Sequence, residues 1–567
     1  MASVATIAAT HGRLSPTWDE SNHIAAGMEP LQDGQYTLFS ENPPFARVAV
    51  ALGPYLDGAR LPSEGRSRAD VESTWSVTWN LGDDVLNETG DTRGRIAQAR
   101  RGTLFFFVLG AAVLWLWIAP FSRPSALLAI AIYCTHPSIL AHAGLATTDL
   151  AFASVFLLAT WRLIRWIEAP STARAAALGG VAGLLVATKF TGLVFFPVLV
   201  VATASTVLIA NRGTGAASPR TLLRRALPLA TVAAPVAFVV LWGAYGFSVG
   251  HVADLPATVC GYPVYGDAVE GLRGSLGQAL LERTIPMPEL VHGLLMLASH
   301  NEAGHSAYAL GQVRTDGFWF FYPLALAVKS PLPFLVLLVT AFVAAFAGFR
   351  RLPWSSAAVL GTIPLILIAL LASNVNIGSR HILAVNALAA AAIGLVVPHA
   401  LPAIRPRWSK FVTTSIVALV VWQAGVAASA FPHFLSYFNS IAAHDPAAYL
   451  VDSDLDWGQG VFELEAFCAN RGIESLHVAL NGSADHCAYN LPALRALQPH
   501  TPVEGWVAIS EYDYRGLAPF VRSDPPCGLE SVVANEGERP FYAWLDEHRP
   551  VAVLANSIRV YHITPAK

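Results

Sequence analysis

Long apolar runs separated by short connections fill residues 102–430 and constrain the fold of this chain most strongly. A helix needs roughly 20 apolar residues to cross a bilayer. A spanning helix also bonds all its backbone groups internally, so such runs predict a polytopic α-helical membrane protein. We expect ten spans with approximate ends, at 102–120, 124–140, 148–166, 173–189, 190–210, 226–249, 319–348, 356–373, 381–400 and 410–430.

Lys329, Pro331 and Pro333 interrupt the long run at 319–348. Proline removes a backbone donor and disturbs a helix interior. A charge inside a span is a functional candidate by default. We therefore expect a kink or an interfacial helix at this point, before the span proper.

Basic residues in the short connections predict which way the helices run, because cytoplasmic loops carry an excess of Lys and Arg. With alternating spans, all such loops lie on one side; they contain Arg162, Arg165, Arg212, Arg220, Arg224, Arg225, Arg350, Arg351, Arg405, Arg407 and Lys410. Segments 11–101, 250–318 and 431–567 then share the extracytoplasmic side of a cell (inner) membrane. The exception is a basic patch that this topology also places outside, formed by Arg93, Arg95, Arg100 and Arg101.

The predicted organisation has three parts. Residues 1–101 form an N-terminal extracytoplasmic loop, 102–430 a transmembrane domain with the outer loop 250–318, and 431–567 a C-terminal extracytoplasmic α/β domain. Local patterns predict strands at Ser475–Leu480, Gly505–Ser510 and Val551–Ile563 and helices at Gln459–Arg471 and Pro540–Glu547. Residues 1–10 are too short to span and do not form a signal peptide, so we expect a missing first span and a truncated or misassigned start.

The overall charge and the cysteines add two further expectations. The formal net charge is -3, which does not point to nucleic acid as a partner. Four cysteines fall in the segments assigned to the outside, where an oxidising environment permits disulfides; they are Cys260, Cys468, Cys487 and Cys527. Cys468 with Cys487 is the first pair to test, and free thiols are an equal alternative.

Polar motifs gather in the predicted outer segments and at the ends of the spans. They are Trp18-Asp19-Glu20 with His23, Glu41-Asn42-Pro43-Pro44-Phe45-Ala46-Arg47, His136-Pro137, Thr147-Thr148-Asp149, Gly317-Phe318-Trp319-Phe320-Phe321-Tyr322-Pro323, Lys329-Ser330-Pro331, Ser373-Asn374-Val375-Asn376-Ile377-Gly378-Ser379-Arg380-His381, Leu435-Ser436-Tyr437-Phe438-Asn439 and Asp452-Ser453-Asp454-Leu455-Asp456-Trp457-Gly458-Gln459. In this order, over nearly the whole chain, they resemble the GT-C superfamily. Within it, the match is to protein O-mannosyltransferase-like enzymes of glycosyltransferase family 39 and the related lipid A aminoarabinose transferases.

The resemblance implies a role for each motif residue. Asp19 would be the general base that takes the acceptor's proton, and Glu20 would support it or hold the acceptor. Cations should face the leaving phosphate; the candidates are Arg47, Arg380, His381 and Lys329, with His23, Glu41 and Asp149 as further site candidates. The chain departs from the family pattern at Asn42, Phe45, Arg47 and Ala384, where His, Leu, Lys and Pro are usual.

The implied reaction moves a hexose, mannose-like, from a polyprenyl-phosphate donor to an extracytoplasmic hydroxyl, with protein Ser/Thr among the acceptors. It requires no cofactor or metal, because protein cations can hold the one phosphate. The alternative is transfer to a lipid or surface polysaccharide on the same scaffold. A non-enzymatic transporter or assembly factor fits less well, because transporters place polar groups near the bilayer midplane, often in repeated halves.

Several residues also have a structural interpretation. Asp149 follows Thr147 and Thr148 at the start of a span and could cap it. Lys189 could snorkel to the interface, and Arg380 with His381 could anchor a span. Another group has EF-hand-like spacing, although Trp457 stands where glycine should be; it consists of Asp452, Asp454, Asp456 and Glu463. A loop that caps the next helix is the preferred interpretation there, and the glycosylation sequons at Asn87 and Asn481 are read as accidental.

Overall fold

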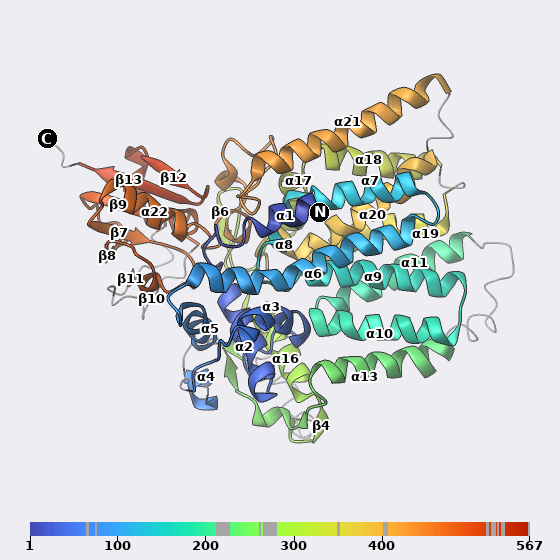
Figure 1. Cartoon of the computed structure of the whole chain (residues 1–567), viewed down its shortest axis with the longest axis horizontal. Helices are drawn as coiled ribbons and strands as arrows, with labels where there is room; N and C mark the ends of the chain where they lie inside the picture. The colour runs from blue at the N-terminus through green and yellow to red at the C-terminus, as the bar shows by residue number, and fades with distance from the viewer. Residues whose placement is uncertain are drawn as a thin grey trace.

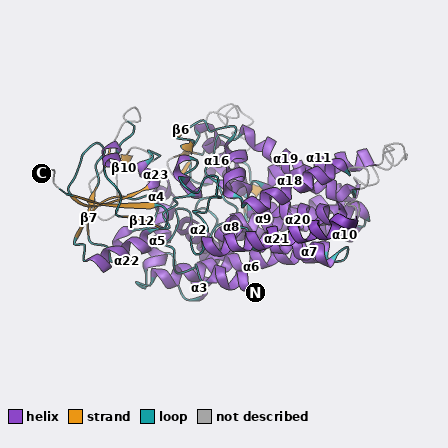
Figure 2. Cartoon of the chain, turned by 90° about the horizontal axis from the view of Figure 1, so that it is seen from above, coloured by secondary structure: helices purple, strands orange, loops and turns teal. Residues whose placement is uncertain are grey.

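A computed structural model shows a bundle of long helices at one end of the molecule and a small sheet domain at the other (Figure 1). The structure describes all residues except 64–66, 74–75, 211–226, 260–261, 265–280, 349–351, 401–405, 518–520, 523–528, 530–531, 534–538 and 565–567. Short helices and hairpins from the N-terminal part and from 249–314 lie between the bundle and the sheet (Figures 1 and 2).

The apolar runs predicted as spans are helical in the structure. Among the described residues, six helices are long and apolar enough to cross a membrane, or up to eight if each of two bent pairs forms one span. The six are α6 (Thr92–Ile118), α9 (Asp149–Glu168), α11 (Gly192–Ala210), α19 (Trp354–Ala369) with η3 (Leu370–Ala372), η4 (Ser379–Ile382) with α20 (Leu383–Ala400), and α21 (Pro406–Ala430). The expected polytopic α-helical membrane protein is confirmed.

The remaining predicted runs form bent or shorter helices. The pair α7 (Arg123–Cys134) and α8 (Pro137–Ala143) bends by 66°, and α17 (Phe321–Lys329) and α18 (Leu332–Ala347) bend by 117°. The second bend falls at Ser330-Pro331, which confirms the break expected there. Two shorter apolar helices complete the set: α10 (Thr172–Thr188) and η1 (Leu229–Ala233) continued by α13 (Ala234–Ala244).

The helices differ in how much protein surrounds them. In an 18-residue window of Ser379–Val397, 83% of the residues are buried inside the protein, against 11% in a window of the same length in Trp408–Ala430. α20, in the first of these stretches, is therefore central. α21 instead exposes large apolar side chains along its length, as a lipid-facing helix does. Gly179 and Gly183 let α10 approach α13 closely, because a Cβ at either position would lie 2.2–2.3 Å from a carbonyl oxygen of the other segment.

The first long helix begins ten residues earlier than expected and carries the discordant basic patch in its first turns. Asp91 caps α6 by accepting a hydrogen bond from the Gly94 amide at 2.9 Å. Three of the patch arginines then form ion pairs with acids outside the bundle: Arg93 with Glu465, Arg95 with Asp57 and Arg100 with Glu20. The patch therefore joins the sheet domain and the N-terminal segment to the bundle.

The segment before α6 is a helical layer and not an extended loop. Its helices are α1 (Ala2–Ala8), α2 (Glu20–Asp33), α3 (Pro44–Leu56), α4 (Arg68–Ser73) and α5 (Val77–Asn87). Two glycines of this layer make close contacts that no side chain could replace. A Cβ at Gly27 of α2 would lie 2.1 Å from the Arg47 carbonyl oxygen of α3, and one at Gly82 of α5 would lie 2.0 Å from that of Ser21.

Segment 249–314 adds α16 (Pro288–Ala303) and short antiparallel hairpins. The strands are β1 (Val249–Gly250) with β4 (Ile285–Pro286), β2 (Thr258–Val259) with β3 (Tyr262–Pro263), and β5 (Ala307–Ala309) with β6 (Gln312–Arg314). Ser40 donates to or accepts from the buried His292 ring at 2.6 Å, which ties α16 to the N-terminal layer.

The C-terminal domain contains a five-stranded mixed sheet in the order β12-β13-β9-β7-β8. Its strands are β7 (Ser475–Ala479), β8 (Ala493–Ala496), β9 (Gly505–Ser510), β12 (Ala552–Leu554) and β13 (Ile558–Ile563). β7 is parallel to β8 and β9, whereas β13 is antiparallel to β9 and β12. α22 (Val461–Arg471) packs on one face through Leu464 and Cys468, and η11 (Ala543–Glu547) on the other through Leu545.

This domain confirms the predicted strands with two differences. β8 was not predicted, and the stretch expected as one strand at 551–563 is a hairpin whose turn residues Ala555 and Asn556 have φ of 48° and 57°. Cys468 and Cys487, the first pair to test, are not joined: Cys468 is a buried free thiol whereas Cys487 is disulfide-bonded. Cys260 and Cys527 lie outside the described residues.

Candidate active site

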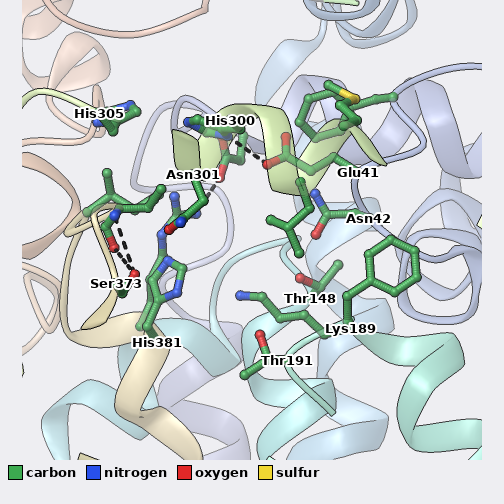
Figure 3. Close-up of a pocket in the computed structure, with 18 of the residues that line it drawn as sticks. Glu41, Asn42, Thr148, Lys189, Thr191, His300, Asn301, His305, Ser373 and His381 are labelled. Atoms are coloured by element: carbon green, nitrogen blue, oxygen red, sulfur yellow. Dashed lines mark hydrogen bonds and ion pairs between the residues drawn. The ribbon is translucent and has the colours of Figure 1, made fainter. Parts of the chain in front are cut away.

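A cavity of about 570 Å³ lies where the N-terminal layer, α11, α16, α19 and the C-terminal domain meet. Its apolar wall includes Phe190, Val194, Phe195, Leu297, Ala369 and Leu370. Its polar lining consists of Asp19, His23, Glu41, Asn42, Thr148, Lys189, Thr191, His300, Asn301, His305, Ser373, Arg380, His381, Asp452, Asn481 and Tyr512. Figure 3 shows side chains from several segments converging on this space.

Asp19 lies at the N-cap of α2 and forms an ion pair with Arg380. The backbone around it is held on both sides, because the Trp18 amide bonds to the Trp457 carbonyl and the Trp79 indole to the Trp18 carbonyl, both at 3.0 Å. Burial acts to raise the pKa of Asp19, but the Arg380 guanidinium outweighs it and holds that pKa below its usual value. Asp19 is therefore a carboxylate at neutral pH.

Arg380 belongs to η4, at the start of the most buried span. Its guanidinium lies 4.5 Å from the centre of the Trp457 ring, which fixes the plane of the cation. Arg380 Nε has no hydrogen-bond partner among the described residues, and neither has Nε2 of the adjacent His381 or Nδ1 of His23. All three side chains line the cavity, so each offers an unused polar atom to a ligand.

A second ion pair joins Asp149 to Lys189, with Lys189 Nζ 2.6 Å from Asp149 Oδ1. Asp149 opens α9, where a negative charge also stabilises the helix N-terminus. Lys189 ends α10 and, unlike Asp149, lines the cavity. Figure 3 shows its amino group pointing into the space near Thr148, on the side of His381.

A third pair also lines the cavity. His300 of α16 contacts Glu41 through Nδ1 at 2.7 Å, as Figure 3 shows. Burial acts to lower the pKa of His300, but the Glu41 carboxylate raises it above the usual value. His305 lies beside His300 with ring centres 5.6 Å apart, and burial lowers its pKa to about 4.

Glu20 does not line the cavity. Its carboxylate is instead surrounded by other protein groups. Its carboxylate binds the Arg100 guanidinium at 2.6 and 2.8 Å, the Ala146 amide at 2.6 Å and the Thr17 amide at 2.8 Å. Both Glu20 and Arg100 are fully buried. This network joins the Asp19 loop to α6 and to the loop before α9, so Glu20 supports its neighbour through structure.

Arg47 is likewise turned away from the cavity. Its guanidinium donates to the backbone carbonyls of Leu38, Phe39 and Pro43 at 2.8–3.2 Å, and its side chain is buried. The structure therefore does not bring this predicted phosphate-binding residue together with Asp19 and Arg380.

Lys329 also lies outside the cavity lining. Its ammonium group donates to the carbonyls of Leu435 and Asp454 at 2.7 and 2.5 Å and lies 4.2 Å from the centre of the Phe438 ring. These contacts join the end of α17 to the segment that leads into the C-terminal domain. Its hydrogen bonds to these two carbonyls give Lys329 a structural role.

The acidic stretch with EF-hand-like spacing is dispersed among different partners. Asp454 accepts from the Ser379 amide, Asp456 from the Tyr512 amide and Glu463 from the Ala555 amide, at 2.7–3.0 Å. Within the described ranges, no three His, Cys, Asp or Glu side chains are grouped as metal ligands would be.

Sequence reasoning did not single out every residue of this cavity. His300 and His305 carry no motif, and only their position in segment 250–318 links them to the predicted outer side. Asp452, Trp457, Asn481 and Tyr512 come from the C-terminal domain. The available signal was the match of 452–459 to the family tail motif, which pointed to importance but not to a place in the site.

No protein-family model matches this chain, and no curated protein does. Among solved structures, ArnT from Cupriavidus metallidurans bound to undecaprenyl phosphate aligns at a TM-score of 0.45 and 12% identity over 99% of this chain and 96% of that chain; the apo form aligns at 0.45 and 14% over 83% and 71%. The Archaeoglobus fulgidus oligosaccharyltransferase aligns at 0.39 and 12% over 76% and 56%.

Proposed function

We propose that this chain is a membrane glycosyltransferase of GT-C type that transfers a mannose-like hexose from a polyprenyl-phosphate donor to a hydroxyl acceptor. The acceptor would lie outside the cytoplasm, with protein Ser/Thr as the first class to test. One observation carries the proposal: a single cavity holds the Asp19 carboxylate, the cations of Arg380 and Lys189, and an apolar wall from membrane helices.

The chemistry needs a base for the acceptor hydroxyl and cations for the leaving phosphate. Asp19 would take the proton of the acceptor hydroxyl while the hydroxyl oxygen bonds to the anomeric carbon. The bond from that carbon to the phosphate oxygen breaks, and the phosphate keeps the electron pair. Arg380 and Lys189 would stabilise the negative charge that grows on the phosphate. His23 and His381 would bind sugar or acceptor hydroxyls through their unused ring nitrogens.

The apolar wall suits the lipid part of such a donor. Val194 and Phe195 lie on α11 and Ala369 and Leu370 at the end of α19, two helices that are long enough to span. A polyprenyl chain lying in the bilayer could follow these helices and leave its phosphate at the polar end of the cavity. Burying the chain there is favourable because its surface is wholly apolar.

A radiolabelled polyprenyl-phosphate mannose assay on membranes containing the protein tests the proposal. Wild-type protein should transfer label to an acceptor, and the Asp19→Asn variant at equal abundance should not. Mass spectrometry of secreted proteins and envelope glycans from a deletion strain then identifies the acceptor. If the deletion strain lost a glycan but kept its protein-linked hexose, the acceptor would be a lipid or surface polysaccharide and not a protein. If no label were transferred from polyprenyl-phosphate mannose, glucose or aminoarabinose, the proposed glycosyltransferase activity would be refuted.

A further inference from the structure

Residues 452–459 contain three aspartates, and only one of them faces the cavity. Asp454 and Asp456 are buried and accept hydrogen bonds from the Ser379 and Tyr512 amides at 3.0 and 2.9 Å. Their carboxylates are therefore used to hold protein segments together. Asp452 alone of the three lines the cavity that holds Asp19 and Arg380.

This segment is clamped to the loop that carries Arg380. The Ser453 hydroxyl donates to the Ile377 carbonyl, and Lys329 donates to the Asp454 carbonyl. Gly378 has φ of 123°, and a Cβ at this position would lie 2.1 Å from Ser453 Oγ, so only glycine allows the approach. The clamp fixes Asp452 relative to the cations of the site.

The backbone of Asp452 is itself unusual. Its φ of 46° lies in the left-handed region, which glycine adopts more readily than a residue with a side chain. The Asp452 carboxylate accepts the Ser453 amide at 2.6 Å, which orients the group. A strained residue held by its surroundings inside a cavity is typical of a functional position.

The neighbours of Asp452 indicate what it could bind. Trp457, Asn481 and Tyr512 line the same cavity and, like Asp452, come from the C-terminal domain. Burial raises the pKa of Asp452 to about 7, so both its protonated and ionised forms exist near neutral pH. A hydroxyl group suits either form, because it both donates and accepts hydrogen bonds, whereas phosphate repels the ionised form.

We propose that Asp452 hydrogen-bonds hydroxyl groups of the sugar that the donor carries, and so acts as a residue of sugar specificity supplied by the C-terminal domain. Arg380 and Lys189 would hold the phosphate, and Asp452 the uncharged sugar beside it. This inference rests on the proposed function, since it assigns a subsite within the same cavity.

The test uses substitutions that the left-handed backbone tolerates. Asp452→Gly removes the side chain and relieves the strain, and Asp452→Asn keeps its size. The KM for polyprenyl-phosphate mannose is compared with the inhibition constant of sugar-free undecaprenyl phosphate, in the full-length protein. Asp452→Gly should raise the KM at least tenfold and leave that inhibition constant and kcat within about twofold. Asp452→Asn should give a smaller increase in KM.

A matched control separates the lost carboxylate from the change in strain. Ala555 has φ of 48° in the turn between β12 and β13 and does not line the cavity, so Ala555→Gly should leave both constants unchanged. An unchanged KM in Asp452→Gly would overturn the inference, and so would a loss of kcat with the same KM. Equal weakening of both ligands would overturn it too. If the wild-type protein transfers no sugar at all, the proposed function fails as well, so the two failures are distinguishable.

Discussion

Arg380 and Asp19 form an ion pair although they are 361 positions apart in the sequence. The pair joins the start of α2 in the N-terminal layer to the start of the most buried span. In the absence of a ligand, the positive charge of Arg380 balances the negative charge of Asp19 and so stabilises the ionised carboxylate. A phosphate that bound Arg380 would compete for the same cation and free a carboxylate oxygen for an acceptor hydroxyl. In the proposed reaction, donor binding would therefore release the base.

Asp19→Asn should reduce sugar transfer by about 10²–10⁴-fold, because an amide cannot accept the acceptor's proton. The substitution keeps the shape of the side chain and its position at the N-cap of α2. Initial rates with radiolabelled polyprenyl-phosphate mannose measure the effect, and fluorescence-detected size exclusion in detergent checks that the protein is inserted and folded. Full activity in a correctly folded variant would remove Asp19 from the role of base.

The two cavity cations should differ from Arg47 in what they control. Arg380→Ala and Lys189→Ala each remove a charged hydrogen-bond donor, which is worth about 1.5–3 kcal/mol. Either should therefore raise the donor KM roughly 10–100-fold. Arg47→Ala should leave the donor KM unchanged and lower thermal stability, because within the described residues its guanidinium donates to backbone carbonyls. If Arg47→Ala alone raised the donor KM, the phosphate site would have to be assigned to α3 instead.

Glu20→Gln should destabilise the protein by about 3–5 kcal/mol, because it leaves Arg100 buried without a counter-charge. Burial acts to raise the pKa of Glu20, but Arg100 holds it below the usual 4.5. The stabilisation is therefore complete above pH 4.5 and is lost as pH falls through the folded-state value. Thermal unfolding in detergent between pH 7 and pH 3 measures this. Glu88→Gln, an exposed position at the end of α5, is the control that should show no loss.

The membrane helices were predictable from sequence because an apolar run is a local property. The break at Ser330-Pro331 was predictable for the same reason. The helical layer before α6 was not, since its close contacts at Gly27 and Gly82 depend on how separate helices meet. The early start of α6 was hidden by Arg93–Arg101, because four arginines look like a loop until their acidic partners are known.

Motif resemblance pointed to polar residues but could not assign their contacts. Asp19, Arg380 and His381 meet in the cavity, whereas Glu20, Arg47 and Lys329 are directed into the protein. A charged side chain is buried only if partners satisfy it, and those partners lie far away in sequence. Lys189 shows the opposite case: a snorkelling lysine and a cavity lysine look the same in sequence, and only the structure shows it paired with Asp149 beside the cavity.

The contact between α16 and the N-terminal layer should weaken at alkaline pH. Glu41 raises the pKa of His300 above the usual 6.5, so their ion pair contributes fully below pH 6.5 and is lost as pH rises through the folded-state value. Hydrogen exchange of Pro288–Ala303, corrected for the intrinsic effect of pH, should be faster at pH 9 than at pH 6. In Glu41→Gln the exchange rate should be high at both values, because His300 then loses the carboxylate that keeps it charged. An identical pH response in wild type and Glu41→Gln would show that this pair does not hold α16 over the cavity.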